Sequence, residues 1–507
     1  EWNYLMGPRM WRDFTTTLQG KFAEDFQKLS EERQACFQDI RTLAAGGNRV
    51  RTDYDALFSS FMHLLRDDQL LELNSAKETP LDSKQLLSLL RHQSNLRTFR
   101  ARLDFSDIDT HDAGPWMAEQ TPLFSLALRL LKSLRIYIGE QSTKGGQLTE
   151  GERREVTHTC EMTCSGLFLK AAPLLDCLEI CGWRQTWPDR VDRIPLTTLY
   201  RNDVMPEQFP RTLSCLLLAD MDLSGAEDKL IGSIDFTALR TLKLEYCDKV
   251  TSFLYTVAAS ITKMGTQLKV LTVRTRKDEI SGDEGDTEDA VKDLLCSFSG
   301  LEELEIDFLA ILFLDWETCL SAHGTLKKLH VSCPRWANGS STWNPTIARI
   351  LGLCPNVQSF GSVIRLQYPG YVMDCQVPFP MYPGLYKVLD TISAAPSICT
   401  LRILNNIGFR ENEANREDRN WIEKVGQIAH HFATVILTHL HSKGSNIRLL
   451  ALSPNLRWKQ SRGDSNLQYY PHYFFRLKLV DVDGRNVIEV APLRDYVAEC
   501  PDAAIFV

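Results

Sequence analysis

The stretch Leu301-Glu302-Glu303-Leu304-Glu305-Ile306-Asp307 and its echo Leu326-Lys327-Lys328-Leu329-His330-Val331-Ser332 share the pattern L-x-x-L-x-(L/I/V)-x. Each follows a segment with helical hydrophobic spacing, so the two are candidate copies of one helix-plus-strand unit. The three apolar positions recur at Leu131/Leu134/Ile136, Leu175/Leu178/Ile180, Leu213/Leu216/Leu218, Leu239/Leu242/Leu244 and Leu268/Leu271/Val273. Poorer copies lie at Leu96/Phe99/Ala101, Val357/Phe360/Ser362, Ile398/Leu401/Ile403, Ile447/Leu450/Leu452 and Phe474/Leu477/Leu479. This recurrence predicts a repeat protein.

A helix followed by a short strand, repeated at intervals of about 25 to 50 residues, predicts an α/β horseshoe solenoid with irregular repeats. Residues 1–66 do not match the pattern, and the spacing of Phe14, Leu18 and Phe22 predicts an N-terminal helical cap. The repeat array is expected over residues 67–465. Residues 466–507 are expected to form a capping strand and a hairpin around Asp483-Gly484.

Composition limits the classes of function. The 507 residues carry a net charge of −8 and have a mean hydropathy of −0.21, which argues against nucleic-acid binding and favours a soluble protein. No apolar run is long enough to cross a bilayer, so no membrane association is expected. Cys177 and Cys181 lie four residues apart on a predicted strand, about 13 Å at 3.3 Å per residue, too far for a disulfide. Reduced cysteines indicate an intracellular location, cytoplasmic or nuclear.

The repeated strands resemble leucine-rich repeats, with Cys247 after Leu244-Glu245-Tyr246 and Asn406 after Ile403-Leu404-Asn405. The irregular repeats and Ala-Pro breaks are similar to those of the fungal F-box and leucine-rich-repeat family, and the run Tyr4 to Trp11 resembles the segment just downstream of the F-box. The F-box itself has no match in residues 1–66. The resemblance implies a substrate-receptor arm of a cullin-type ubiquitin ligase, bound to a Skp-type linker through an F-box upstream of Glu1.

Residues between the template leucines are expected to face the concave surface, because side chains alternate along a strand. We expect these positions to bind a protein partner, and they are Arg100, Arg102, Arg135, Glu179, Lys243, Glu245, Glu303, Glu305, Asp307, Lys328 and His330. Glu303, Glu305 and Asp307 form an acidic stripe with Lys328 and His330 on the next strand. Either these neighbours and solvent neutralise the stripe, or it binds a basic partner. Replacing the three acids with Ala is expected to leave the thermal midpoint nearly unchanged while weakening partner binding.

Known catalytic and metal motifs are absent from the sequence, so no enzyme activity, cofactor or metal is expected. The acidic run from Asp278 to Asp286 lacks the order of a calcium loop, and His158, Cys160 and Cys164 lack a second ligand pair. Two alternatives to the ubiquitin-ligase arm stay open: a stand-alone scaffold without a link to ubiquitin, and a hydrolase without a recognised motif.

Overall fold

The computed structural model divides into two compact units, Glu1–Leu268 (unit 1) and Lys269–Val507 (unit 2). Each is described by itself. The structure describes residues 13–17, 41–46, 62, 65–75, 80–104, 108, 113–139, 166–183, 194–196, 209–225, 227–275, 284–307, 314–332, 343–364, 366, 383–405, 421–454, 457–459, 467–469, 473–482 and 485–493.

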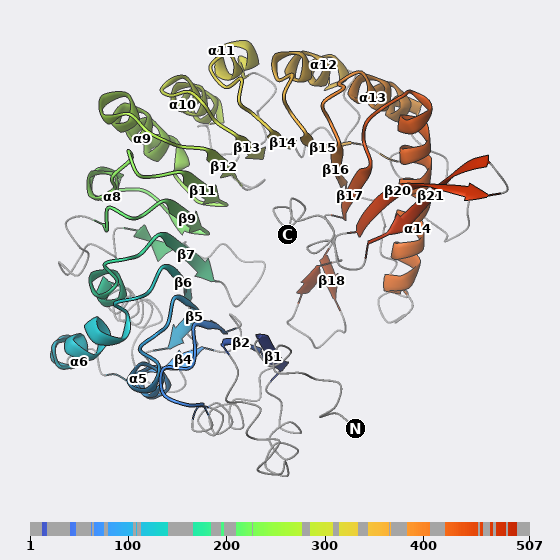
Figure 1. Ribbon diagram of the computed structural model, residues 1–507. Coiled ribbons are helices and arrows are strands. Elements are labelled where there is room, and N and C mark those ends of the chain that lie inside the picture. Colours follow the sequence, from blue (N-terminus) through green and yellow to red (C-terminus); the bar gives the residue numbers. More distant parts are fainter. Residues whose placement is uncertain are drawn as a thin grey trace, which may run out of the picture. The chain divides into compact units, whose positions relative to one another are not determined.

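Each repeat places its apolar template residues on one face of a strand. In the strand Glu303–Asp307 (β13), Leu304 and Ile306 are buried, whereas Glu303, Glu305 and Asp307 alternate with them on the other face. Burial of each such apolar side chain stabilises the fold by roughly 1.5–3 kcal/mol. The helices lie on the leucine side of the sheets in both units (Figure 1). We call the opposite face, which carries the residues between the template positions, the polar face.

Unit 1 contains a ladder of parallel strands in the order β1-β2-β3-β5-β6-β7-β9-β11. The strands are Asp13–Thr17 (β1), Thr42–Gly46 (β2), Glu72–Ser75 (β3), Thr98–Asp104 (β5), Ser133–Gly139 (β6), Cys177–Trp183 (β7), Cys215–Ala219 (β9) and Thr241–Glu245 (β11). Three short strands also belong to the unit: Leu81–Asp82 (β4), Ile194–Pro195 (β8) and Met221–Asp222 (β10). Its labelled helices are Ser83–His92 (α5), Ala113–Ala127 (α6), Glu227–Ser233 (α8) and Val250–Met264 (α9).

Unit 2 continues the repeat as the parallel ladder β12-β13-β14-β15-β16-β17. Its further strands are Val270–Arg274 (β12), Lys328–Ser332 (β14), Ser359–Val363 (β15), Thr400–Asn405 (β16), Leu449–Pro454 (β17), Arg457–Lys459 (β18), Leu467–Tyr469 (β19), Tyr473–Val482 (β20) and Arg485–Pro492 (β21). Its labelled helices are Glu284–Cys296 (α10), Trp316–Leu320 (α11), Trp343–Leu353 (α12), Pro383–Ser393 (α13) and Trp421–Ser442 (α14).

Neighbouring repeats are joined by hydrogen bonds at fixed positions. The carbonyl after the first template residue accepts two amide hydrogens from the next repeat, as when Glu302 O accepts from Lys327 N and Lys328 N. In three repeats, an asparagine just before the first template residue adds a side-chain hydrogen bond. These asparagines donate to backbone carbonyls of the preceding repeat: Asn95 to Asp68 at 3.2 Å, Asn356 to Gly324 at 2.7 Å and Asn446 to Pro396 at 2.7 Å. Such bonds satisfy turn carbonyls that the strand ladder does not reach.

Helix starts follow local capping chemistry where the sequence offers it. Asp82 precedes α5 and accepts from Gln85 N, while the Gln85 side chain accepts from Asp82 N. This capping box explains why α5 begins at Ser83. Helix α11 begins at Trp316 after Asp315, whose side chain accepts from Thr318 N.

The expectation of an all-helical N-terminal segment is wrong for two stretches. Residues 13–17 and 42–46 are the strands β1 and β2, and they pair parallel with one another and, through β2, with β3. Leu71 N and Glu72 N donate to Arg41 O, so the ladder between repeats already includes this segment. Phe14, assigned above to a helical stripe, is the register partner of the buried Leu43. Strand pairing overrides a weak helical periodicity here, and the run Thr15 to Thr17 favours β structure.

The C-terminal part of unit 2 contains the expected hairpin. β20 and β21 pair antiparallel on either side of Asp483-Gly484, and β20 pairs antiparallel with β17. Phe474, Leu477 and Leu479 therefore belong to a hairpin strand and are not a further parallel repeat. Leu479 is 52% exposed, unlike the template residues of the parallel strands.

Candidate functional site

The predicted partner-binding residues lie on the polar faces of both sheets. Unit 1 carries Arg100 and Arg102 on β5, Arg135 on β6, Glu179 on β7, and Lys243 and Glu245 on β11. Unit 2 carries Glu303, Glu305 and Asp307 on β13, and Lys328 and His330 on β14. One-to-one register places the polar-face residues in rows that cross neighbouring strands. One such row in unit 1 runs through Arg100, Arg135, Glu179, Leu217 and Lys243.

The N-terminal end of that row is a charge cluster. Arg135 makes an ion pair with Glu179, and Arg100 Nη2 lies 3.9 Å from Glu179 Oε1. Arg135 Nη1 also donates to the Tyr137 hydroxyl at 3.3 Å. Burial disfavours the charge on Arg135, but Glu179 and Tyr137 together outweigh this effect, and the pKa of the guanidinium lies above its ordinary value. The structure therefore brings Arg100, Arg135 and Glu179 together.

Arg102, Lys243 and Glu245 are not part of this cluster. Arg102 occupies the adjacent row, opposite Tyr137, and is buried. Lys243 is separated from Glu179 by Leu217 on β9, and Glu245 lies opposite Ala219. Lys243 and Glu245 are half-buried.

In unit 2 the acidic stripe is paired within the protein. Lys328 Nζ lies 2.9 Å from Glu303 Oε1, and His330 Nδ1 lies 2.6 Å from Glu305 Oε1. Arg274, from β12 on the other side, places Nη2 2.9 Å from the same Glu305 oxygen. This pairing supports the interpretation in which neighbouring side chains neutralise the stripe.

Glu305 and Asp307 are both largely buried, yet their pKa values shift in opposite directions because their neighbours differ. Burial alone would raise the pKa of Glu305, but His330, Arg274 and Arg402 outweigh it and hold that pKa well below its usual range. The pKa of Asp307 is raised instead, because burial outweighs its hydrogen bond with Ser332 and the nearby His330 and Arg274. Glu305 is thus the anionic centre of the group.

Three residues of this group were not predicted from the sequence: Arg274, Gly361 and Arg402. Arg274 lies opposite Asp307, and Arg402 lies two strands from His330, with Gly361 between them. A Cβ atom on Gly361 would lie 2.9 Å from His330 Cδ2, so the missing side chain makes room for the imidazole. Alignment of the template leucines places Arg274 and Arg402 on the polar face, which is the signal that could have found them.

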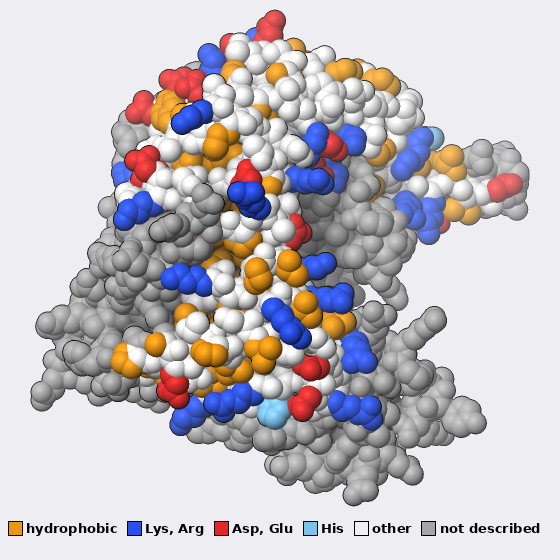
Figure 2. Space-filling view, turned by 60° about the vertical axis from the view of Figure 1, so that its left-hand side comes forward, with side chains coloured by type: hydrophobic (Ala, Val, Ile, Leu, Met, Phe, Trp, Pro, Cys, Tyr) orange, Lys and Arg blue, Asp and Glu red, His pale blue; other side chains and the backbone are white. Residues whose placement is uncertain are grey.

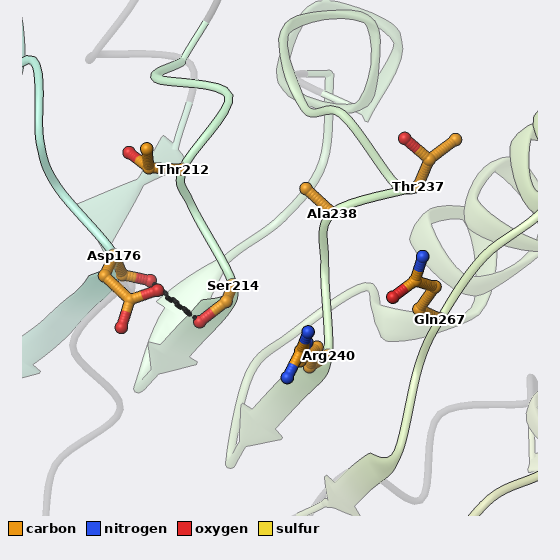
Figure 3. Close-up of a pocket in the computed structure, with 7 residues that line it drawn as sticks. All are labelled: Asp176, Thr212, Ser214, Thr237, Ala238, Arg240 and Gln267. Atoms are coloured by element: carbon orange, nitrogen blue, oxygen red, sulfur yellow. Dashed lines mark hydrogen bonds between the residues drawn. The ribbon is translucent and has the colours of Figure 1, made fainter.

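A polar groove of about 480 Å³ lies in unit 1 at the edge where the strands begin (Figure 3). It is lined by Asp176, Thr212, Ser214, Thr237, Ala238, Arg240 and Gln267, all from turns or strand starts. Ser214 Oγ donates to Asp176 Oδ1 at 2.5 Å. Hydroxyls, one carboxylate and one guanidinium can bind a polar partner, but this set lacks a histidine or cysteine to activate a nucleophile.

Basic side chains recur along the same edge. Arg97, Lys132 and Arg240 each follow the first template residue of a repeat and are exposed. Asp176 occupies the equivalent position of its own repeat and interrupts the row. Figure 2 shows Lys and Arg side chains at several places on the described surface, interspersed with Asp and Glu side chains. These residues share the position after the first template residue, and this shared position is the signal in the sequence for the edge.

Metal and membrane-spanning sites are absent from the described part of the chain. There, no group of three or more His, Cys, Asp or Glu side chains could hold a metal ion. His430 bonds with Val490 O at 2.8 Å, and His439 with Asp390 at 2.8 Å. His158, Cys160 and Cys164 lie outside the described residues, as does most of the acidic run that begins at Asp278. No described helix combines the length and apolar character needed to cross a membrane.

Comparison with known proteins gives little further information. No protein-family model matches the sequence, and no curated protein matches it. Among solved structures, the chain is similar to one in the crystal structure of the Rad7 and Elc1 complex in yeast. The sequence identity is 13%, the similarity covers 77% of this chain and 83% of that chain, and the TM-score is 0.39. A likeness at this level carries no argument about function.

Proposed function

We propose that the chain is a protein–protein recognition scaffold whose partner binds along the polar face. The observation that carries the proposal is the register of the parallel strands, which sets polar side chains side by side about 4.8 Å apart across each unit. Rows of this kind form an extended surface, which suits a macromolecular partner. We propose that the chain acts by binding and not by catalysis.

Charge favours unit 1 as the part that recognises a charged partner. Its predicted site carries the partly exposed cations Arg100, Arg135 and Lys243, and the first two share the single buried carboxylate of Glu179. In unit 2, by contrast, the acidic stripe is paired with Lys328, Arg274 and His330. An acidic protein segment on unit 1 therefore fits better than a basic segment on unit 2.

We further propose that this scaffold is the substrate-receptor arm of a cullin-type ubiquitin ligase. The support is the resemblance of the repeats, and of the run Tyr4 to Trp11, to fungal F-box and leucine-rich-repeat proteins. On this proposal a Skp-type linker binds through an F-box upstream of Glu1. A stand-alone scaffold without a link to ubiquitin is the alternative.

Affinity capture of the tagged protein, followed by mass spectrometry, tests both levels. Recovery of a protein partner together with a Skp-type linker and a cullin supports the ligase arm. Recovery of a partner without linker or cullin favours the stand-alone scaffold. Recovery of no protein above the level of a tag-only control contradicts the recognition proposal itself.

A further inference from the structure

Two cysteines from adjacent repeats face each other in unit 1. Cys177 on β7 is the direct register partner of Cys215 on β9. Direct partners on neighbouring strands are about 4.8 Å apart, inside the range of roughly 4.4–6.8 Å between Cα atoms that a disulfide bridges. Both side chains lie on the polar face and are half-buried, so a small oxidant can reach them. The neighbouring Leu178 and Leu216 point into the core.

The two facing thiols influence each other's ionisation. The Cys177 thiol donates a hydrogen bond to Cys215 sulfur, and this bond lowers the pKa of Cys215 despite its burial. The same bond, together with burial, raises the pKa of Cys177. Cys177 Sγ also lies 3.7 Å from Glu179 Oε1, a second acceptor for its single proton. The pair is therefore asymmetric, because Cys215 loses its proton more readily than Cys177.

We propose that Cys177 and Cys215 are a reversible oxidation site at which a hydroperoxide converts two facing thiols into a disulfide between adjacent repeats. This site is independent of the partner-binding proposal. It uses the chemistry of redox-sensing cysteines, in which a nucleophilic thiolate lies beside a resolving thiol.

The reaction takes two steps and consumes one hydrogen peroxide. Cys215 thiolate attacks a peroxide oxygen, an S–O bond forms, the O–O bond breaks, and the departing hydroxide takes up a proton to become water. Cys177 sulfur then attacks the resulting sulfenic acid, the S–S bond forms, the S–O bond breaks, and a second water leaves with the Cys177 proton. The sulfurs are oxidised by two electrons and the peroxide is reduced. A thiol reductant reverses the bond by exchange.

Cys181 provides a matched control on the same strand. It lies four residues beyond Cys177 on the same face of β7 but is opposite Ala219, so it has no facing thiol in the register. Burial raises the pKa of Cys181 to about 12, which keeps its thiol protonated. The proposal therefore predicts oxidation at the facing pair and not at Cys181.

The test treats the reduced full chain with graded hydrogen peroxide, blocks remaining thiols with N-ethylmaleimide and maps peptides by mass spectrometry. We expect a Cys177–Cys215 cross-linked peptide that a thiol reductant removes. It should be lost in Cys177→Ser and Cys215→Ser but kept in Cys181→Ser. Dimedone should trap a sulfenic acid on Cys215 in Cys177→Ser and none on Cys177 in Cys215→Ser.

Circular dichroism establishes that each variant is folded. Absence of the cross-linked peptide at every peroxide concentration overturns the proposal. So does bridging of Cys215 to another cysteine, or equal cross-linking in the folded chain and in urea, because the effect would then not depend on the register of β7 and β9.

Discussion

Glu305 has a nitrogen partner from each adjacent strand, the Arg274 guanidinium on one side and the His330 imidazole on the other. Its side chain is 16% exposed, so water replaces these partners poorly. Removing one member of a buried ion pair leaves the other charge uncompensated, and this usually costs more than the pair itself contributes. The acidic stripe therefore contributes to the stability of the fold. This differs from the expectation that replacing its three acids with Ala leaves the thermal midpoint nearly unchanged.

Replacing Glu305 with Gln is expected to lower the free energy of unfolding by about 3 kcal/mol, because Arg274 and His330 lose their carboxylate. Urea unfolding followed by circular dichroism measures this change. Glu302→Gln is the matched control, because the Glu302 carboxylate also pairs with a cation, Lys327 Nζ at 2.9 Å, but is 35% exposed. The control should change stability by less than about 1 kcal/mol. Equal losses in the two variants would contradict the account of a buried charge group.

Gly361 is the second residue on which this group depends. In Gly361→Ala the new Cβ would press on the His330 ring, so the ring must move away from Glu305 or the strands must shift. We expect a loss of about 1–3 kcal/mol in the free energy of unfolding, typical of overpacking. Gly352→Ala on α12 is the control, because nothing lies within 4 Å of its Cβ position, and it should be neutral or slightly stabilising. A Gly361→Ala variant as stable as the parent would show that the imidazole does not need this space.

At the scale of elements, one repeat position carries a buried side chain that makes two hydrogen bonds to the backbone of the preceding repeat. This side chain is glutamine in one repeat and histidine in another. Gln93 lies three residues before Leu96; its Oε1 accepts from Leu70 N at 2.7 Å and its Nε2 donates to Arg66 O at 2.9 Å. His323 lies three residues before Leu326 and makes the corresponding two bonds. Its Nδ1 accepts from Leu301 N at 3.3 Å, and its Nε2 lies 3.0 Å from Leu295 O. Both side chains are fully buried.

This equivalence predicts the outcome of His323→Gln. Burial lowers the pKa of His323 below its ordinary value, so the folded state prefers the neutral ring. Its contribution to stability is fully present above about pH 6.5, the ordinary pKa of histidine, and is lost as the pH falls through the folded-state pKa. Glutamine can keep both hydrogen bonds and does not titrate. Unfolding free energies measured from about pH 7.5 to about pH 5.5 should therefore fall more steeply for the parent than for His323→Gln. Parallel pH profiles for the two proteins would contradict the assignment.

At the scale of the whole molecule, the sequence pattern predicts the repeated strands because burial of the template leucines is a local and periodic signal. It misses β1 and β2, where Leu43 is the buried residue of a poor copy and a helical stripe competes with it. The division at Leu268/Lys269 has no counterpart in the pattern, and the predicted domain boundaries at residues 66/67 and 465/466 stay predictions.

The candidate site was predicted less completely than the fold. The template gives the polar-face positions, but which charges are neutralised depends on the partner strand, as Arg274 shows for Glu305. Cys177 and Cys215 were within reach of the sequence, since each precedes the second template leucine of its repeat. Spacing along one strand excludes only a Cys177–Cys181 bond, whereas the Cys177–Cys215 pairing depends on the register of β7 and β9.

Binding along the polar face is most directly tested by comparing two charge reversals in unit 1. Lys243→Glu changes a half-buried polar-face residue on β11, whereas Lys263→Glu changes an exposed residue in the last turn of α9. The measurement is the amount of partner recovered by affinity capture with each variant, with the thermal midpoint recorded to establish folding. The account predicts that Lys243→Glu loses the partner while Lys263→Glu recovers as much as the parent. Equal recovery by two folded variants, or loss only in Lys263→Glu, would contradict it.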